Sequence, residues 1–293
     1  MAFFPFLKKR DAKQAGPYRE ALELIPAPHS TLNDLAFALS IRFEEREDFK
    51  DLEECIRCHR EALELRPLLH AKRAQSLNAL AWALSARFAR KGGFNDLEES
   101  IDYYGQALQL SPAPHSFRPI PLTNLGRALI KRFRKKGDFD DLNASLQCHD
   151  EALKLRPPLH PDRHMSFFGV AYVLQALFME TKDFEDLEES IWCYREALEL
   201  IPELHLNRPI SLNNLGFALS TRFQQKGKFE DLDESIQCLQ EALDLFPASH
   251  PKRLRSLNNL AKVLSTRFQE KGDIEDQDES IRCRREALEL GPI

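Results

Sequence analysis

The sequence predicts an all-α fold, a solenoid of antiparallel helix pairs, on three observations. Segments of the form A-L-x-L-x-P recur along the chain, first after 41 residues and then every 45 residues. Two rows of phenylalanines keep the 45-residue period, one beginning at Phe43 and one at Phe49, and Ile274 completes the second row. Glycine is scarce, at 11 of 293 residues, which argues against an all-β chain. A fixed period over six repeats indicates helical units that stack and bury their apolar faces on one another.

The first helix of each repeat is predicted from apolar residues that share one helical face. In the sixth repeat, Leu257, Leu260 and Leu264 lie three and four residues apart, the spacing that places side chains on one side of an α-helix. Lys271 and Gly272 follow as a basic last turn and a glycine stop, and both are favourable at a helix C-terminus.

The second helix of each repeat is predicted to begin in an acidic stretch such as residues 183–186. An aspartate there can cap the open N–H groups, and carboxylates suit the positive end of the helix dipole. In the second repeat, Phe94, Leu97 and Ile101 continue at helical spacing. The helix is expected to end before the repeat proline, which cannot continue it.

The repeat boundaries divide the chain into an irregular segment at residues 1–16 and a single repeat array at residues 17–293. The array begins with a half repeat at residues 17–29, in which Pro17 can open a short helix. Six full repeats follow, at residues 30–67, 76–112, 121–157, 166–202, 211–247 and 256–292. Neither end carries a polar capping helix, which leaves two interpretations: the sequence is a piece of a longer array, or its end faces stack on a partner or on another copy by end-to-end self-association.

Charge and composition exclude several classes of partner. The formal net charge is −5, whereas nucleic-acid binding needs a basic surface, so no nucleic-acid partner is expected. The longest nearly apolar run, residues 167–179, is too short to span a bilayer. The N-terminal MAFFPFLKKR places its apolar run before its basic run, the reverse of a secretory signal. A cytoplasmic protein without a membrane partner is therefore expected.

A row of histidines and a pair of cysteines have features of a metal site and of a redox site, but both are interpreted as structural. Six histidines follow the repeat prolines by three residues, at His29, His70, His115, His160, His205 and His250. Neighbouring repeats lie ~8–10 Å apart, whereas zinc ligands all lie about 2 Å from one ion, so these histidines are expected to bond backbone groups in turns. The arginines three residues later, Arg73, Arg118, Arg163, Arg208 and Arg253, are expected to join neighbouring repeats.

Cys55 and Cys58 have the spacing of a redox pair, but such a pair works at a strand-to-helix junction, and these two lie within a predicted helix. The six cysteines are therefore expected to be free thiols. The sequence contains no phosphate loop, dinucleotide-binding fingerprint or metalloprotease motif. The chain is predicted not to be an enzyme and to use no cofactor and no metal.

The motif S-L-N-N-L-A…A-L-E-L-x-P resembles the tetratricopeptide repeat, with a small residue after the leucine of the first helix. That small residue is Ala36, Ala81, Gly126, Ala171, Gly216 or Ala261. The 45-residue length and the segment from His250 to Ala261 also resemble kinesin light chains. The strongest resemblance is to the repeats of basidiomycete fungal proteins that carry a CHAT protease-like or NTPase domain, which this sequence lacks. The resemblance implies a right-handed superhelix.

The resemblance also implies that the first helices line a concave groove that binds a partner protein or peptide. One candidate row in that groove is Asn33, Asn78, Thr123, Phe168, Asn213 and Asn258, and the next is Asp34, Ala79, Asn124, Gly169, Asn214 and Asn259. An asparagine amide offers both a donor and an acceptor, so these side chains either clamp a bound peptide or bond within the array. A third row is Phe37, Trp82, Arg127, Tyr172, Phe217 and Lys262. Its aromatic members either anchor a partner or pack under the next repeat.

The fourth repeat departs most from the others, because Met165, Phe168, Tyr172 and Phe178 make its first helix apolar almost all round. Arg127 and Lys131 are expected to border this patch from the third repeat, so partner binding is centred on the third to fifth repeats. The leading hypothesis is a non-catalytic scaffold. The alternative is a regulatory arm of a larger fungal signalling protein with a CHAT protease-like or NTPase domain.

Overall fold

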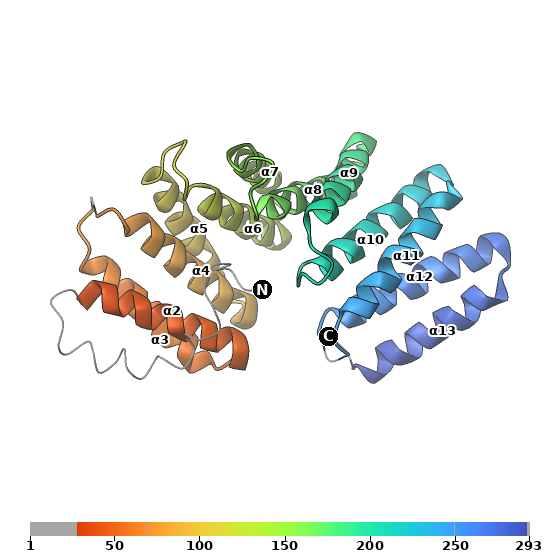
Figure 1. Cartoon of the computed structure of the whole chain (residues 1–293), viewed down its shortest axis with the longest axis horizontal. Helices are drawn as coiled ribbons and strands as arrows, with labels where there is room; N and C mark the ends of the chain where they lie inside the picture. The colour runs from red at the N-terminus through yellow and green to blue at the C-terminus, as the bar shows by residue number, and fades with distance from the viewer. Residues whose placement is uncertain (1–27, 69, 249, 292–293) are drawn as a thin grey trace. The chain divides into compact units, whose positions relative to one another are not determined.

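The computed structural model describes residues 28–68, 70–248 and 250–291 (Figure 1). Over these residues the chain forms helices and turns and contains no strand, which confirms the all-α prediction. The predicted segment at 1–16 lies outside the described residues, as does the half repeat at 17–29 up to residue 27. Pro28 and His29 already belong to the first described helix.

Six helix pairs make up the described part of the chain, and their first and second members are called A and B helices. The A helices are α2 (Pro28–Arg46), α4 (Arg73–Lys91), α6 (Pro119–Lys136), α8 (Arg163–Thr181), α10 (Arg208–Lys226) and α12 (Arg253–Lys271). The B helices are α3 (Phe49–Glu64), α5 (Phe94–Gln109), α7 (Phe139–Leu155), α9 (Phe184–Leu200), α11 (Phe229–Leu245) and α13 (Ile274–Glu289). The second phenylalanine row therefore marks the first residue of each B helix.

The helices divide into two compact units, a first unit with α2–α7 and a second unit with α8–α13. Within each unit, every A helix contacts the B helix of its own repeat, and each B helix contacts the following A helix. The continuity of the six repeats in a single array stays a prediction. No helix among the described residues is long and apolar enough to cross a membrane.

The turn between A and B helices contains a left-handed residue, and in several repeats an aspartate caps the B helix that follows. Gly92 has a φ of 75° and its N–H donates to the Phe88 carbonyl at 2.8 Å, a geometry that favours glycine. In the fourth repeat Lys182 takes this position with a φ of 62°. Asp183 then accepts a hydrogen bond from the Glu185 N–H at 3.0 Å and caps α9, as the sequence predicts.

The connection from one repeat to the next is held by the histidine of each repeat. The imidazole Nδ1 of His205 accepts a hydrogen bond from the backbone N–H of Asn207 at 3.1 Å. The backbone N–H of His205 donates to the Pro202 carbonyl at 3.0 Å. His70, His115, His160 and His250 make the same pair of bonds. The structural interpretation of these five histidines is confirmed, whereas the side chain of His29 lies outside the described part of the chain. Among the residues that the structure describes, no cluster of three or more His, Cys, Asp or Glu is arranged to hold a metal ion.

The arginine three residues after each histidine binds the end of the preceding B helix. Arg253 donates from Nη1 to the carbonyls of Leu243 (2.6 Å) and Phe246 (3.3 Å), and from Nε to Glu286 (2.7 Å). Carbonyls in the last turn of a helix have no partner within it, so this side chain satisfies them from the next repeat. The arginines thus join neighbouring repeats, as expected, but through carbonyls at helix ends.

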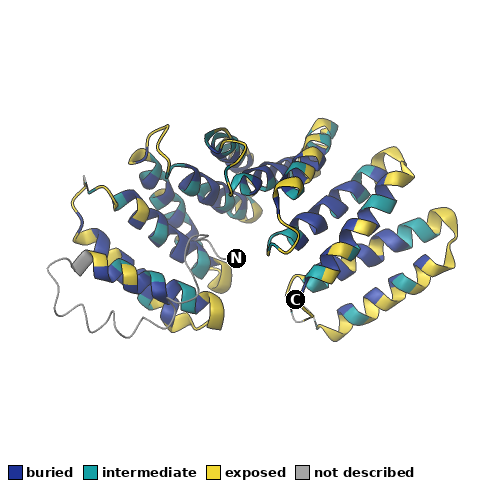
Figure 2. Cartoon of the chain, in the orientation of Figure 1, coloured by how far each residue is buried: buried dark blue, intermediate teal, exposed yellow. Residues whose placement is uncertain are grey.

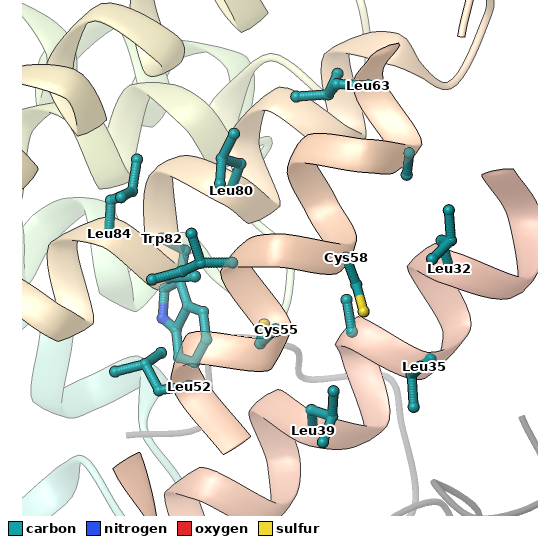
Figure 3. Packing of buried hydrophobic residues seen from close by; sticks show 14 of the residues in the cluster. Leu32, Leu35, Leu39, Leu52, Cys55, Cys58, Leu63, Leu80, Trp82 and Leu84 are labelled. Atoms are coloured by element: carbon teal, nitrogen blue, oxygen red, sulfur yellow. The ribbon is translucent and has the colours of Figure 1, made fainter. Parts of the chain in front are cut away.

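The B helix α3 buries two stripes of side chains. One stripe contains Cys55 and Cys58 and the other contains Leu52 and Ile56, and all four lie in the core that α3 forms with α2 and α4. Figure 3 shows Cys55 and Cys58 inside this core. Burial raises the pKa of the Cys55 thiol far above its ordinary value, which keeps it protonated and unreactive. All six cysteines are free thiols, as predicted.

A second row of arginines pairs with aspartates across five of the six described helix hairpins. Arg222 donates from Nε and Nη2 to both carboxylate oxygens of Asp231, at 2.9 and 2.6 Å, and its Nη1 reaches Glu188 of the preceding repeat at 2.7 Å. The fourth repeat has Leu177 where the other repeats have this arginine. Burial and the neighbouring acidic residues raise the pKa of Asp186 there. The hairpin of the fourth repeat thus lacks an ion pair that stabilises the other five.

Candidate partner-binding surface

The asparagines predicted to line a groove lie mostly inside the repeat stack. Asn78, Asn124, Asn213 and Asn214 are all buried. Asn124 donates from Nδ2 to the Asn78 Oδ1 at 3.1 Å, which links α6 to α4. Of the two roles that the sequence left open, the structure supports bonds within the array for these four residues.

The same kind of bond links α12 to α10 in the second unit. The Asn213 Oδ1 accepts from the Ser256 hydroxyl and from the Asn259 Nδ2, each at 3.0 Å. Asn33, which is half-buried, lies 3.3 Å from the His59 Nδ1 and accepts from the Ser76 hydroxyl at 3.3 Å. These amides fix the spacing of successive A helices, and they leave Asn258 as the exposed asparagine of the predicted set.

Trp82 and Phe178 are core residues, so for Trp82 the structure supports packing within the array, one of the two roles that the sequence left open. Trp82 is 8% exposed and packs in the cluster that contains Leu52 and Leu80 (Figure 3). Phe178 is buried and its ring lies 6.5 Å from that of Phe184. Neither side chain can serve as a contact without unpacking the repeat.

The second unit keeps a group of aromatic residues at its A helices. The rings of Phe168 and Tyr172 stack on α8, with centroids 6.1 Å apart and planes at 15°. Phe168 also meets the buried Tyr194 edge to face at 5.8 Å. Phe168, Tyr172 and the Phe217 side chain of α10 are each half-buried. The three rings therefore have one packed side and one side that water reaches.

Polar residues continue the same helical positions on α12, where Asn258 and Lys262 are exposed. Successive A helices α8, α10 and α12 contact one another. We call the residues Phe168, Tyr172, Phe217, Asn258 and Lys262 the A-helix face of the second unit. It changes from aromatic on α8 to polar and basic on α12, which suits an amphipathic ligand.

The first unit presents Phe37, Arg127 and Lys131 at the equivalent helices, and all three are half-buried. Lys131 donates from Nζ to the Ser85 hydroxyl at 2.8 Å. Burial, and then the positive charge of Arg127, lowers the pKa of Lys131 to about 8. An acidic ligand group near these two cations would offset part of the free-energy cost of burying the charged Lys131 ammonium. Their predicted place beside Phe168 stays a prediction, because the two units are separate bodies.

Replacing Lys131 by methionine should raise the free energy of unfolding at pH 7 by on the order of 1 kcal/mol, since the ionised ammonium is partly desolvated in the folded chain. The folded pKa lies below the unfolded one, so the unfolded state binds more protons between about pH 8 and 10.5. The stability of the parent should rise through that window and the benefit of Lys131→Met should shrink. Urea unfolding at pH 7 and pH 9.5 measures this, with the exposed Lys135→Met as control. Equal gains at both pH values would contradict it.

Trp192 is not among the residues predicted from the sequence, and it is 52% exposed on the B helix α9. Its ring meets Phe167 edge to face at 5.7 Å. The signal was present in the repeat alignment, because the same position holds Arg57, Asp102 and Gln147 in the first three repeats. A tryptophan among charged and polar residues marks a second exposed aromatic surface, on a different helix from the A-helix face.

Comparisons with known proteins agree with the fold. A tetratricopeptide repeat model matches residues 30–66, 210–252 and 253–291. No curated protein matches the chain. Solved structures that are similar include PilF of Pseudomonas aeruginosa, at 17% identity over 90% of this chain and 94% of the other, with a TM-score of 0.60. A kinesin light chain-like protein of Podospora anserina is 18% identical over 76% of this chain and 99% of the other, with a TM-score of 0.53.

The APC/C hetero-tetramer Cut9–Hcn1 is similar over 97% of this chain and 44% of the other, with 15% identity and a TM-score of 0.66. At these identities the likeness concerns the fold and not the residues of a site. The helix pairs, the repeat-model matches and the solved structures lead to one conclusion: the chain has an all-α helical-repeat fold of the tetratricopeptide type.

Proposed function

We propose that the chain is a non-catalytic scaffold that binds a partner protein or peptide on the A-helix face of the second unit. Tetratricopeptide-type repeats generally serve protein–protein interaction, which supports the general class. The observation that carries the proposal is the stacked pair Phe168 and Tyr172. Four of the other five repeats have an asparagine and one has a threonine where the fourth has Phe168.

Half-buried aromatic rings are favourable anchors for a partner. A ring that is already packed on one side loses little conformational freedom when its other side is covered, and aromatic residues dominate interface energetics. Phe217 on the next A helix extends the apolar area, and Lys262 on α12 adds a positive charge at its edge. A ligand with apolar side chains and an acidic group, lying across the three helices, fits this order.

Replacing Tyr172 by alanine should weaken partner binding by about 1–2 kcal/mol, or roughly 5- to 30-fold in the dissociation constant. The partner is recovered with the immobilised full chain, identified by mass spectrometry and titrated calorimetrically against each variant. Trp192→Ala removes a more exposed aromatic residue from α9 and should leave binding unchanged. A Tyr172→Ala chain that loses several kcal/mol of stability, as a core aromatic would, contradicts the proposal, and so does loss of binding in Trp192→Ala alone.

The alternative, a regulatory arm of a larger protein with a CHAT protease-like or NTPase domain, stays a prediction. It assigns ligand sensing to the same A-helix face, and sequencing of the transcript beyond Ile293 tests it. Self-association is a separate property, because it needs the end of a repeat stack and not the A helices.

A further inference from the structure

The B helix α9 carries an exposed tryptophan within a row of glutamates. Trp192 is 52% exposed, and the exposed residues of α9 are coloured yellow in Figure 2. Residues three and four positions apart share one side of a helix. On the side that carries Trp192 this spacing collects four glutamates, of which three are exposed and Glu196 is half-buried. We call this set the α9 row: Glu185, Glu189, Trp192, Glu196 and Glu199.

Two residues that distinguish the fourth repeat build the centre of this row. Trp192 stands where the other five repeats have arginine, aspartate or glutamine. Phe167 on α8 stands where the other five have leucine, and it is buried. The two rings meet edge to face with centroids 5.7 Å apart. The contact with a buried ring restrains the indole while the residue stays exposed, so covering it costs little further conformational freedom.

The glutamate next to Trp192 lacks the partner that the corresponding glutamates have. In the third, fifth and sixth repeats that glutamate pairs with the arginine at the start of the A helix. These pairs are Arg118–Glu151, Arg208–Glu241 and Arg253–Glu286. In the fourth repeat the guanidinium carbon of Arg163 lies 5.1 Å from the centroid of the Phe167 ring, and Glu196 forms no ion pair with a described residue. A carboxylate that is paired in other repeats is therefore open to an outside cation beside the exposed indole.

The negative charge of the α9 row is not compensated within its helix. None of the four glutamates in the row forms an ion pair with a described residue. Arg195 is the one cationic residue of α9, and it donates to Glu234 of the next repeat. Burial, and then neighbouring acidic groups of which Asp183 is the first, raise the pKa of Asp186, as expected where carboxylates crowd together. Such a surface attracts cationic ligands and repels nucleic acid and anionic lipid.

Arginine is the side chain that best fits the centre of the row. Glu189 and Glu196 lie three and four residues to either side of Trp192. A guanidinium is planar, so it can lie on the indole while its N–H groups donate to a neighbouring carboxylate. The helix α9 is 17 residues long, and a second helix presents side chains at the same three- and four-residue intervals. A helical segment with arginines at those intervals therefore matches the row in charge and in spacing.

We propose that the α9 row docks a basic helical segment of a partner protein, with an arginine of that segment on Trp192. The row lies on a B helix, so the inference does not depend on the proposed role of the A-helix face. A contact of one helix with one helix is smaller than a standard interface, so the expected dissociation constant is roughly micromolar or weaker. Because the charges are exposed, added salt should weaken binding.

The probe is a synthetic helical peptide of about 18 residues, long enough to cover α9. It is made of arginine, leucine and alanine, with arginines at three- and four-residue intervals. Acrylamide quenching of tryptophan emission from the full chain should fall as peptide is added over about 1 to 300 µM. The peptide would cover Trp192, whereas Trp82, the other tryptophan, is already buried. A peptide of the same composition with its arginines spread around the helix should bind roughly 5-fold more weakly or less.

Two variants of the α9 row test the indole and the carboxylates separately. Trp192→Gln introduces the residue type of the third and fifth repeats and should weaken binding of the fluorescein-labelled peptide roughly 10-fold or more. Glu185→Gln combined with Glu199→Gln should weaken it roughly 3- to 10-fold. The matched control is Glu230→Gln combined with Asp244→Asn, at the equivalent exposed positions of α11. It removes the same charge and should leave binding nearly unchanged.

Far-ultraviolet circular dichroism should be the same for the parent and all three variants, because every substituted side chain is exposed. A parent chain that shows no saturable binding of the peptide up to about 300 µM overturns the proposal. So does a dissociation constant that Trp192→Gln leaves unchanged. Equal weakening by the α9 and α11 charge variants would also overturn it, since the peptide would then respond only to the net charge of the chain.

Discussion

Replacing Arg253 by methionine is expected to lower the free energy of unfolding by about 3 kcal/mol, measured as the shift in urea unfolding. The guanidinium donates to two carbonyls at the end of α11 and to Glu286 on α13. It is mostly buried, and bonds that involve a charged partner contribute about 1.5–3 kcal/mol each. Methionine keeps much of the aliphatic volume and removes every donor, so the carbonyls of Leu243 and Phe246 lose this charged partner.

Arg255 supplies a matched control, since it is exposed two residues later on the same helix. Arg255→Met should change stability by no more than about 0.5 kcal/mol. Arg253→Lys keeps the charge but not the planar fork that reaches carbonyls and carboxylate together, so an intermediate loss is expected. Equal effects of Arg253→Met and Arg255→Met would show that the repeat junction does not depend on this side chain.

The repeat period predicted the arginine row but not its binding partners. Helix pairs, their order and the place of the turns all follow from rows of leucine, phenylalanine, proline and histidine at a fixed spacing. The carbonyl acceptors of Arg253 carry no signal in the sequence, because every residue has a carbonyl. The carbonyls that lack a partner within their own helix are those of its last turn, so the acceptors depend on where the helix ends.

The candidate site was less predictable than the fold. The sequence placed Asn78, Asn124, Asn213 and Trp82 on the A helices but could not tell their buried side from their accessible one. Successive A helices approach closely enough for the Asn124 amide to donate to the Asn78 oxygen. The Phe168 substitution was visible as a break in the pattern, and its stacking on Tyr172 required the structure.

The row of small residues on the A helices contains both alanine and glycine, two residues that the sequence pattern alone treats as equivalent. Gly126 and Gly216 occupy places where the other four repeats have alanine. A Cβ on Gly126 would lie 2.6 Å from Nε2 and 2.9 Å from Cδ2 of His149, whose side chain is fully buried. In the first repeat Ala36 coexists with His59, whose ring lies against the Asn33 amide. The third repeat has Thr123 in place of that asparagine, and its hydroxyl donates to the Pro119 carbonyl.

Gly126→Ala is therefore expected to destabilise the chain by about 2 kcal/mol, because overpacking a core costs about 1–3 kcal/mol or more and exceeds the roughly 1 kcal/mol that alanine contributes to a helix. Gly105→Ala is the matched control on α5, where a Cβ meets no atom within 4 Å. It should stabilise by about 0.5–1 kcal/mol. The two substitutions are chemically identical and should shift the urea midpoint in opposite directions.

His149 can be identified as the cause by a double-mutant cycle. In a His149→Ala background the imidazole is gone, so the added methyl of Gly126→Ala has room and its penalty should vanish or turn into a small gain. The coupling free energy between the two positions should then be about 2 kcal/mol or more. If Gly126→Ala costs the same with and without the imidazole, the close approach to His149 is not what requires glycine at this position. The backbone of α6 would then be the cause.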